Sequence, residues 1–425
     1  MLRIEIGHLR WRILLAILPV FLTACGLEVA SPSTQDPRYT TSTTPEKARM
    51  SPTASNGQVS SLPILYRANL GRTGVYNTKG VPDIHGILWK FQAGGAIRSS
   101  PALAGSIIYF GSDDRNLYAA DVDTGKQIWA FPTTAQQGET EFGAINIAPA
   151  ITDHQVYFVG ADDVLRAVDT STGQERWTQA AHGNNSSSPA IMDDTIYMGG
   201  SEGLLALATA NGQEKWSFQV EDGMAVTAPA LSAGIVYFGS SGSYSYALDA
   251  VTGKEKWRFH TSLPVYATPA VAGGLVYFAS WSGNKAGEGY LYAVDAQSGQ
   301  LKWKFVTHSP GIRSPAVGDG VVYLGSAQTG TGFGIFVDNS LYAVDSASGQ
   351  EEWRFDTEKD VATAPTVADG LIYFGSGDGY FYAVDTSSGQ LKWKLNIPGR
   401  ITTDPVVADG VIYFGTDDGY LYALH

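Results

Sequence analysis

The chain repeats a pattern of four short apolar runs, seen most clearly in residues 364–395. The runs are rich in Val, Ile, Tyr, Phe and Trp and are bounded by turn sequences such as Asp369-Gly370 and Gly377-Asp378-Gly379. Apolar runs this short, each closed by a Gly or an Asp-Gly pair, are typical of β-strands joined by tight turns and do not suit helices. Each unit is therefore predicted to be a four-stranded antiparallel β-sheet.

The unit recurs in eight copies at a spacing of about forty residues. A proline precedes the first strand of each copy, at positions 101, 149, 189, 229, 269, 315, 365 and 405. A tryptophan marks each fourth strand: Trp89, Trp129, Trp177, Trp216, Trp257, Trp303, Trp353 and Trp393. Four strands per unit at this period predict an all-β fold, an eight-bladed β-propeller. The tryptophans are interpreted as structural residues that dock on the neighbouring blade.

The two ends of the repeat predict how the ring closes. The eighth copy stops after its third strand, whereas an unpartnered strand at 87–91, which contains Trp89, precedes the first copy. We expect this N-terminal strand to complete the last blade, so that no open sheet edge remains where the ends meet.

The N-terminal segment predicts export and a lipid anchor. Residues 1–24 combine three Arg with a short apolar run, as in a signal peptide, although a retained anchor helix is the alternative. Leu22-Thr23-Ala24-Cys25 resembles the bacterial lipobox, in which the cysteine is lipidated, and Cys25 is the only cysteine of the chain. Residues 25–60 are rich in Ser, Thr and Pro and are predicted to be a disordered tether, followed by a single propeller domain at 61–425.

The charge of the chain limits its partners. Without residues 1–24, which hold three Arg and one Glu, the chain carries 25 basic and 40 acidic residues, a net charge of −15. Such a charge disfavours nucleic acid and anionic lipid surfaces as partners. It favours a soluble propeller that contacts basic or neutral partners.

The repeat resembles that of the pyrroloquinoline-quinone (PQQ) dehydrogenases and their non-catalytic relatives. The matching elements are Pro-Ala-Val, Val-Tyr-Phe-Gly-Ser, Leu-Tyr-Ala-Val-Asp and a Ser/Thr-Gly followed by Trp, and the LYRANLGRTG stretch at 65–74 resembles the family's lead-in to the first blade. We expect residues 62–86 to lie along the rim or across one face. The lipobox, the tether and eight blades are most similar to the BamB family of outer-membrane assembly lipoproteins. That resemblance implies a monomeric, lipid-anchored protein of the cell envelope, facing the periplasm from the outer membrane if the organism has one.

The chemistry of the quinoprotein enzymes has no match in the sequence. Those enzymes resemble this repeat but carry a vicinal cysteine pair, which a chain with one cysteine lacks. No calcium-ligating set or catalytic Asp can be matched, so the sequence predicts no enzyme and no cofactor, neither PQQ nor calcium. The pairs Asp113-Asp114, Asp162-Asp163 and Asp417-Asp418 could contact a metal, but they fall in predicted hairpins, where Asp suits the turn.

Function on a repeated scaffold is expected where the copies differ. Three insertions, at 132–144, 281–289 and 327–339, lie between strands two and three of a blade or in the link to the next blade. In an antiparallel blade these connections emerge on one face. Their apolar residues are Trp281, Phe333, Ile335 and Phe336. They form a partner or ligand surface, or fold back over the propeller.

The segments that lead into the inner strands lie on the same face and surround the central channel. They carry different residues in each blade, among them Arg98, Asn146, Tyr266, Arg313 and Arg400. Three arginines near one channel mouth suggest contact with an anion, and the alternative is pairing with neighbouring Asp and Glu.

Three functions are compatible with these features. The first is a non-catalytic scaffold for protein partners in the envelope, with outer-membrane protein assembly as the candidate process. The second is a propeller that binds a small molecule or a glycan. The third, which the missing cysteine pair disfavours, is a PQQ-dependent dehydrogenase.

Overall fold

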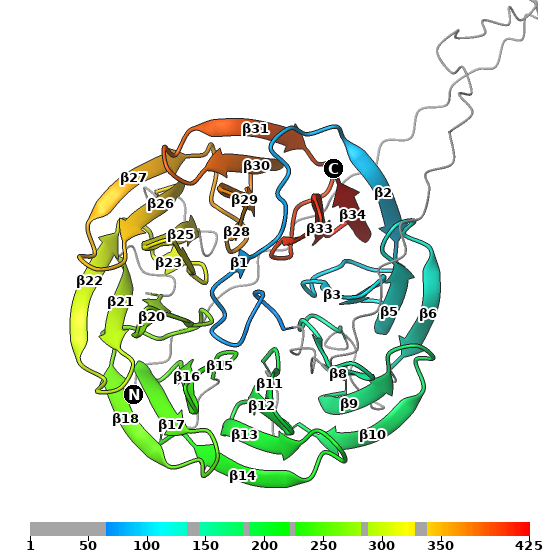
Figure 1. Cartoon of the computed structure of the whole chain (residues 1–425), viewed down its shortest axis with the longest axis horizontal. Helices are drawn as coiled ribbons and strands as arrows, with labels where there is room; N and C mark the ends of the chain where they lie inside the picture. Colours follow the sequence, from blue (N-terminus) through cyan, green and yellow to red (C-terminus); the bar gives the residue numbers. More distant parts are fainter. Residues whose placement is uncertain are drawn as a thin grey trace, which may run out of the picture. The chain divides into compact units, whose positions relative to one another are not determined.

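The computed structural model describes residues 65–133, 144–160, 162–181, 187–221, 226–281, 288–327 and 338–425. These residues form eight β-sheets arranged as the blades of a ring (Figure 1), which confirms the predicted all-β propeller. All of them belong to one compact unit, Val59–His425. Within the described ranges no helix is long and apolar enough to span a membrane.

Each blade is a meander of four antiparallel strands that runs from the channel outward. The innermost strands, from the first to the eighth blade, are β3 (Ala102–Ala104), β7 (Ala150–Ile151), β11 (Ala190–Met192), β15 (Ala230–Ser232), β19 (Ala270–Ala272), β24 (Ala316–Gly318), β28 (Thr366–Ala368) and β32 (Val406–Ala408). The second strands are β4 (Ile107–Gly111), β8 (Gln155–Val159), β12 (Thr195–Gly199), β16 (Ile235–Gly239), β20 (Leu275–Ser280), β25 (Val321–Ala327), β29 (Leu371–Gly375) and β33 (Val411–Gly415).

The third strands are β5 (Asn116–Asp121), β9 (Val164–Asp169), β13 (Gly203–Ala208), β17 (Tyr244–Asp249), β21 (Gly289–Asp295), β26 (Ser340–Asp345), β30 (Tyr380–Asp385) and β34 (Tyr420–Leu424). The outermost strands are β6 (Gln127–Pro132), β10 (Glu175–Ala180), β14 (Glu214–Gln219), β18 (Glu255–His260), β22 (Leu301–Thr307), β27 (Glu351–Asp356), β31 (Leu391–Asn396) and, in the eighth blade, β2 (Ile87–Gln92). Two short strands, β1 (Val75–Tyr76) and β23 (Gly311–Ile312), add to the seventh and sixth blades.

The eighth blade is assembled from both ends of the described chain. Strand β2 pairs antiparallel with β34, from Ile87 opposite Leu424 to Gln92 opposite Tyr420. In Figure 1 the blue β2 lies beside the red β34. The C-terminal copy thus obtains its fourth strand from the N-terminal side, and the edge of β34 is covered.

The hydrophobic core is divided among the gaps between neighbouring blades. Eight clusters of buried side chains in the described residues each join two adjacent blades. The second and third strands are buried on both faces, whereas the outermost strands alternate exposed and buried positions. This division explains why the middle runs of the repeat are continuously apolar and the tryptophan run is not.

The tryptophans connect each blade to the next one. The indole N–H of each of the eight fourth-strand tryptophans donates a hydrogen bond to a main-chain carbonyl at 2.8–3.0 Å. The carbonyl belongs to the following blade, except that Trp393 donates to Val81 of the lead-in segment. From Trp89 to Trp393 the acceptors are Val122, Thr170, Thr209, Ala250, Ala296, Ser346, Thr386 and Val81. In the first seven pairs the acceptor lies in or beside the turn between strands three and four.

Residues 65–76 lie in the channel, whereas the sequence suggested a path along the rim or across one face. Residues 78–86 do cross one face, over the strand one–two turns of the seventh and eighth blades, where Gly80 donates to Asp369 and the Lys79 carbonyl accepts from Gly410. The carbonyls of Leu70, Gly71, Thr73 and Gly74 accept hydrogen bonds from the inner strands of the fourth to seventh blades, at 2.7–2.9 Å. The physical reason is that the innermost strand of each blade has an unpaired edge, and this segment supplies acceptors for it. Figure 1 shows the segment in blue across the middle of the ring.

Candidate functional site

The segments that lead into the inner strands place two tiers of side chains around the channel. In seven of the eight blades a buried aliphatic residue, such as Ile97, Val265 or Ile401, is held by the end of the second strand of the same blade or its neighbour; in the third blade the equivalent position lies outside the described residues. The next residue faces the channel and forms the upper tier. In ring order the upper tier is Arg98, Asn146, Ser187, Thr227, Tyr266, Arg313, Ala362 and Thr402.

The lower tier is formed by the residue that precedes each strand-one proline. Its members are Ser100, Ala148, Ser188, Ala228, Thr268, Ser314, Ala364 and Asp404. Four of these side chains each accept a hydrogen bond from the main-chain N–H of the lower-tier residue in the preceding blade, at 2.8–3.2 Å. The N–H of Asp404 donates to Ser100, that of Ala148 to Ser188, that of Thr268 to Ser314 and that of Ala364 to Asp404.

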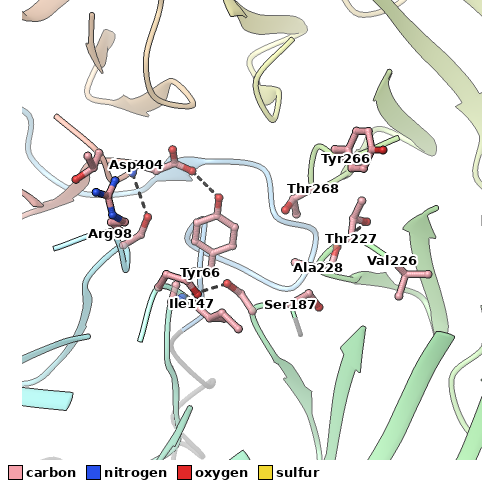
Figure 2. Close-up of a pocket in the computed structure, with 15 residues that line it drawn as sticks. Tyr66, Arg98, Ile147, Ser187, Val226, Thr227, Ala228, Tyr266, Thr268 and Asp404 are labelled. Atoms are coloured by element: carbon pink, nitrogen blue, oxygen red, sulfur yellow. Dashed lines mark hydrogen bonds between the residues drawn. The ribbon is translucent and has the colours of Figure 1, made fainter. Parts of the chain in front are cut away.

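The two tiers enclose a cavity of about 320 Å³, which we call the cup. The cup is bounded by the tier residues of the first to fifth and eighth blades, and Tyr66 from the lead-in segment forms part of its wall (Figure 2). Arg313 and Ala362, in the sixth and seventh blades, do not line it. The cup therefore lies to one side of the channel axis.

The lead-in segment blocks the channel next to the cup with two buried arginines. Arg72 is fully buried and donates to the carbonyls of Tyr66, Ser188, Pro189 and Pro229. Burial lowers the pKa of Arg72 to about 10, so the guanidinium is still protonated at neutral pH. Because the Arg72 guanidinium donates to all of these carbonyls, its hydrogen bonds fix this segment in the channel.

Arg67 and Tyr66 fix the one carboxylate of the cup. Arg67 donates to the carbonyl of Pro315 at 2.6 Å, and its Nη1 lies 3.5 Å from the Asp404 carboxylate. Tyr66 donates its hydroxyl to Asp404 at 2.6 Å, and burial raises the pKa of Tyr66, which keeps that proton in place. Asp404 is thus held by the protein itself (Figure 2).

The structure places only two of the three arginines that the sequence grouped in one tier. Arg98 and Arg313 occupy the same tier, and each faces a carboxylate: Asp113 at 2.9 Å and Asp360 at 3.9 Å. Arg400 precedes the buried Ile401 and lies outside both tiers, where its main-chain N–H donates to Asp417. Arg98 and Arg313 therefore pair with neighbouring Asp residues, which was the alternative interpretation of the sequence.

Asn146, Tyr266 and Trp281 lie at or beside the cup. Asn146 and Tyr266 line it, and Tyr266 is 51% exposed. Trp281 packs edge-on against Tyr266 with ring centroids 4.9 Å apart, so this insertion residue folds back toward the propeller. Phe333, Ile335 and Phe336 lie outside the described residues, as does Cys25.

Sequence reasoning missed most of the cup. Tyr66, Ser100, Ser188, Thr268 and Thr402 are small or common residues, and nothing in their spacing marks them as neighbours across the ring. The signal that existed was the LYRANLGRTG stretch, whose irregular sequence between a tether and a regular repeat marked a segment with a special path.

The paired aspartates act in the hairpins where they were expected. Asp114 accepts hydrogen bonds from the Gly94 N–H and the Tyr118 hydroxyl, both at 2.7 Å, and Asp162 pairs with Arg166. Among the described residues there is no group of three or more His, Cys, Asp or Glu placed to hold a metal ion. These carboxylates already have protein partners.

The resemblance to the PQQ dehydrogenases implies a calcium-bound quinone as the group that a channel site of this fold could hold. Calcium requires six to eight converging oxygens, several of them from carboxylates. The cup offers one carboxylate, Asp404, whose oxygens are engaged by Tyr66, Arg67 and the Ala364 N–H. The residues that line the cup therefore do not fit this cofactor pair.

Comparison with known proteins identifies the family. The model of the family described as outer membrane protein assembly factor BamB matches residues 85–228, 220–336 and 337–425, which is most of the chain. The chain belongs to the BamB family. No curated protein sequence matches the chain.

Solved structures share the fold of this BamB-family chain at low sequence identity. BamB from Moraxella catarrhalis is 19% identical with a TM-score of 0.63, over 80% of this chain and 97% of that one. A europium-containing methanol dehydrogenase is 14% identical with a TM-score of 0.68, over 85% and 97% of the two chains. Quinohemoprotein alcohol dehydrogenase from Comamonas testosteroni is 15% identical with a TM-score of 0.69, over 85% and 80%. These likenesses show the propeller fold, which enzymes and non-enzymes share.

Proposed function

We propose that the protein is a non-catalytic scaffold of the cell envelope that binds protein partners in the assembly of outer-membrane proteins. The observation that carries the proposal is the match of the BamB family model to residues 85–425. The cup supports the non-catalytic part, since its lining residues offer no open carboxylate set for a calcium ion and a quinone. The single cysteine excludes the vicinal pair of the alcohol-oxidising relatives.

The partner surface is proposed to be the face that carries the three insertions. Short turns of similar length on the opposite face give a partner little to distinguish, whereas the insertions differ in length and composition between blades. Trp281 folds back on Tyr266, so the proposal places the principal contacts on residues 327–337, which include Phe333, Ile335 and Phe336.

A crosslinked membrane pull-down of the full lipidated chain tests this proposal, with bound proteins identified by mass spectrometry. Recovery of an outer-membrane barrel-assembly component is expected from the wild type and is lost from a variant that lacks residues 327–337. Val251→Ser is the control, because Val251 is 81% exposed in a turn between strands three and four on the opposite face. Equal recovery from a folded deletion variant would reject the proposed surface, and recovery of no envelope partner by the wild type would reject the scaffold.

The anchor is proposed to be a lipid on Cys25, and a single substitution tests it. Cys25→Ser is expected to release the protein from the membrane fraction while leaving the propeller folded, because several acyl chains are needed for stable anchoring. Fractionation followed by immunoblotting measures the shift. A Cys25→Ser protein that remains in the membrane pellet would point to a retained N-terminal helix.

A further inference from the structure

Several polar side chains that line the cup have hydrogen-bonding capacity that no described residue uses. Ser100 and Ser188 each accept a main-chain N–H, but neither hydroxyl donates to any residue in the described ranges. The side chains of Asn146, Tyr266 and Thr268 make no hydrogen bond to a described residue either. Unused donors and acceptors on the wall of one cavity are suited to a hydroxyl-rich ligand.

Arg98 adds a charged donor group to this wall. Its Nε donates to Asp113 at 2.9 Å, which orients the guanidinium, while the two terminal nitrogens donate to no described residue. Asp404, the other charged residue among those that line the cup, is held by Tyr66 and lies 3.5 Å from Arg67. The unused charged donors therefore belong to Arg98, and a carboxylate is the group that fits a guanidinium fork.

Tyr266 supplies an exposed aromatic ring across the cup from Arg98 (Figure 2). The ring is 51% exposed, although it packs against Trp281 on one side. An exposed aromatic ring at the lip of a polar cavity offers an apolar surface to the C–H groups on one face of a sugar ring. A cavity of about 320 Å³ is at the small end of ligand pockets, which span roughly 300–1,000 Å³.

We propose that the cup binds an acidic sugar, a single sugar ring that carries a carboxylate. The ring lies against Tyr266, its hydroxyls bond to Ser100, Asn146, Ser188 and Thr268, and its carboxylate takes the terminal nitrogens of Arg98. The site does not depend on the protein partners proposed above, since the described residues that line it are tier residues, Ile147, Val226 and Tyr66.

Isothermal titration of the full-length protein in detergent tests the ligand class. Glucuronic acid and N-acetylmuramic acid are the acidic probes, glucose is the neutral sugar, and citrate is a carboxylate without a sugar ring. Saturable binding of at least one acidic sugar is expected, with glucose and citrate at least about tenfold weaker. No saturable binding of either acidic sugar, or equal binding of citrate, overturns the proposal, as does tighter binding of PQQ with calcium at the same site.

Three variants test whether the cup is the site. Arg98→Gln is expected to weaken the acidic sugar about tenfold or more while leaving glucose unchanged, because a hydrogen bond to a charged group is lost. Tyr266→Ala is expected to weaken both sugars. Arg400→Gln is the matched control, since it removes the same charge from the same face but lies outside both tiers. If Arg400→Gln weakens binding as much as Arg98→Gln, with unfolding midpoints unchanged, the sugar is held by general charge and the assignment to the cup is wrong.

Discussion

At the scale of single residues, the blade interfaces depend on a glycine opposite seven of the eight fourth-strand tryptophans. Gly299 has φ +72° and contacts Trp257, and a Cβ built at Gly299 would lie 2.8 Å from the indole ring. The same approach recurs at Gly125, Gly173, Gly212, Gly253, Gly349 and Gly389. The glycine therefore serves two purposes, the left-handed turn and the space for the indole.

Replacing such a glycine separates the two purposes. Gly299→Ala is expected to destabilise the propeller by about 1–3 kcal/mol more than Gly274→Ala, because only the first forces a methyl group into a neighbour. Gly274 also has a positive φ, +77°, but nothing lies within 4 Å of the position that a methyl group would take there, so it controls for backbone strain. Urea unfolding curves measure both changes. Equal losses of stability would mean that the turn alone requires the glycine.

Ser245 is a buried residue that departs from the repeat. Its side chain is fully buried and its hydroxyl has no hydrogen-bond partner in the described chain, as is also true of the Ser240 hydroxyl. The same strand position holds Leu117, Leu291 and Phe381 in other blades, each fully buried. The fourth blade therefore carries a small, polar side chain where its neighbours fill the interface.

We expect Ser245→Leu to stabilise the protein by about 1–3 kcal/mol, since it adds buried apolar area and removes an unsatisfied hydroxyl. Ser245→Ala removes the hydroxyl without filling the space and should account for part of the gain. Thermal and urea unfolding of the three proteins provide the comparison. A destabilised leucine variant would indicate that ordered water occupies the position and satisfies the serines.

At the scale of elements, the turns between strands three and four are organised by a carboxylate. Asp295 accepts hydrogen bonds from the N–H and hydroxyl of Ser298, and the pKa of Asp295 is lowered to about 2 by these bonds, with Lys302 nearby. Equivalent hydrogen bonds from a Ser or Thr in the turn lower the pKa of Asp249, Asp345 and Asp385. In the third blade Ala208 replaces the aspartate, yet the turn still closes through the Gly212 N–H and the Ala208 carbonyl. The carboxylate therefore strengthens a turn that the backbone can form alone.

The lowered pKa of Asp295 predicts how the free energy of unfolding depends on pH. Asp295 is ionised more readily in the folded chain, so its contribution is present above the ordinary aspartate pKa near 4 and is lost as the pH falls toward about 2. Asp295→Asn should reduce the loss of stability between pH 5 and about 3 and should lower stability at pH 7. Urea midpoints across that range measure the slope. Asp319→Asn, in a turn on the same face, is the control, and an identical acid slope in both variants would contradict the assignment.

At the scale of the whole molecule, the regular part of the structure was predictable and the cup was not. Each blade contacts its two neighbours, so the period, the tryptophans and the strand at 87–91 were sufficient to predict the ring. The cup depends on Tyr66, which belongs to the non-repeating segment 65–86, and on the two tiers, whose residues differ from blade to blade. The sequence therefore grouped Arg98, Arg313 and Arg400, whereas the structure places the first two in one tier and Arg400 outside it.

Ring closure depends on one segment that replaces two missing parts of the eighth blade. Strand β2 provides the fourth strand. Val81 replaces the absent turn between strands three and four as the hydrogen-bond partner of the seventh blade: its carbonyl accepts from Trp393, and its N–H donates to the Tyr373 hydroxyl. In the other blades a turn of a few residues joins strand four to strand three. Strand β2 has no such turn, because nearly the whole propeller separates it from β34.

This difference predicts where the propeller opens first. Strand β2 and its counterpart β18 have similar burial, with Trp89 and Trp257 9% and 8% exposed, so packing alone would protect them equally. Since no turn retains β2 after its hydrogen bonds break, we expect its amides to exchange with deuterium faster than those of β18. Hydrogen exchange followed by mass spectrometry compares peptides covering 87–92 and 255–260. Equal protection would mean that Val81 and the buried Arg72 anchor the N-terminal segment as firmly as a covalent turn does, and Arg72→Met should then accelerate exchange in β2 while leaving β18 unchanged.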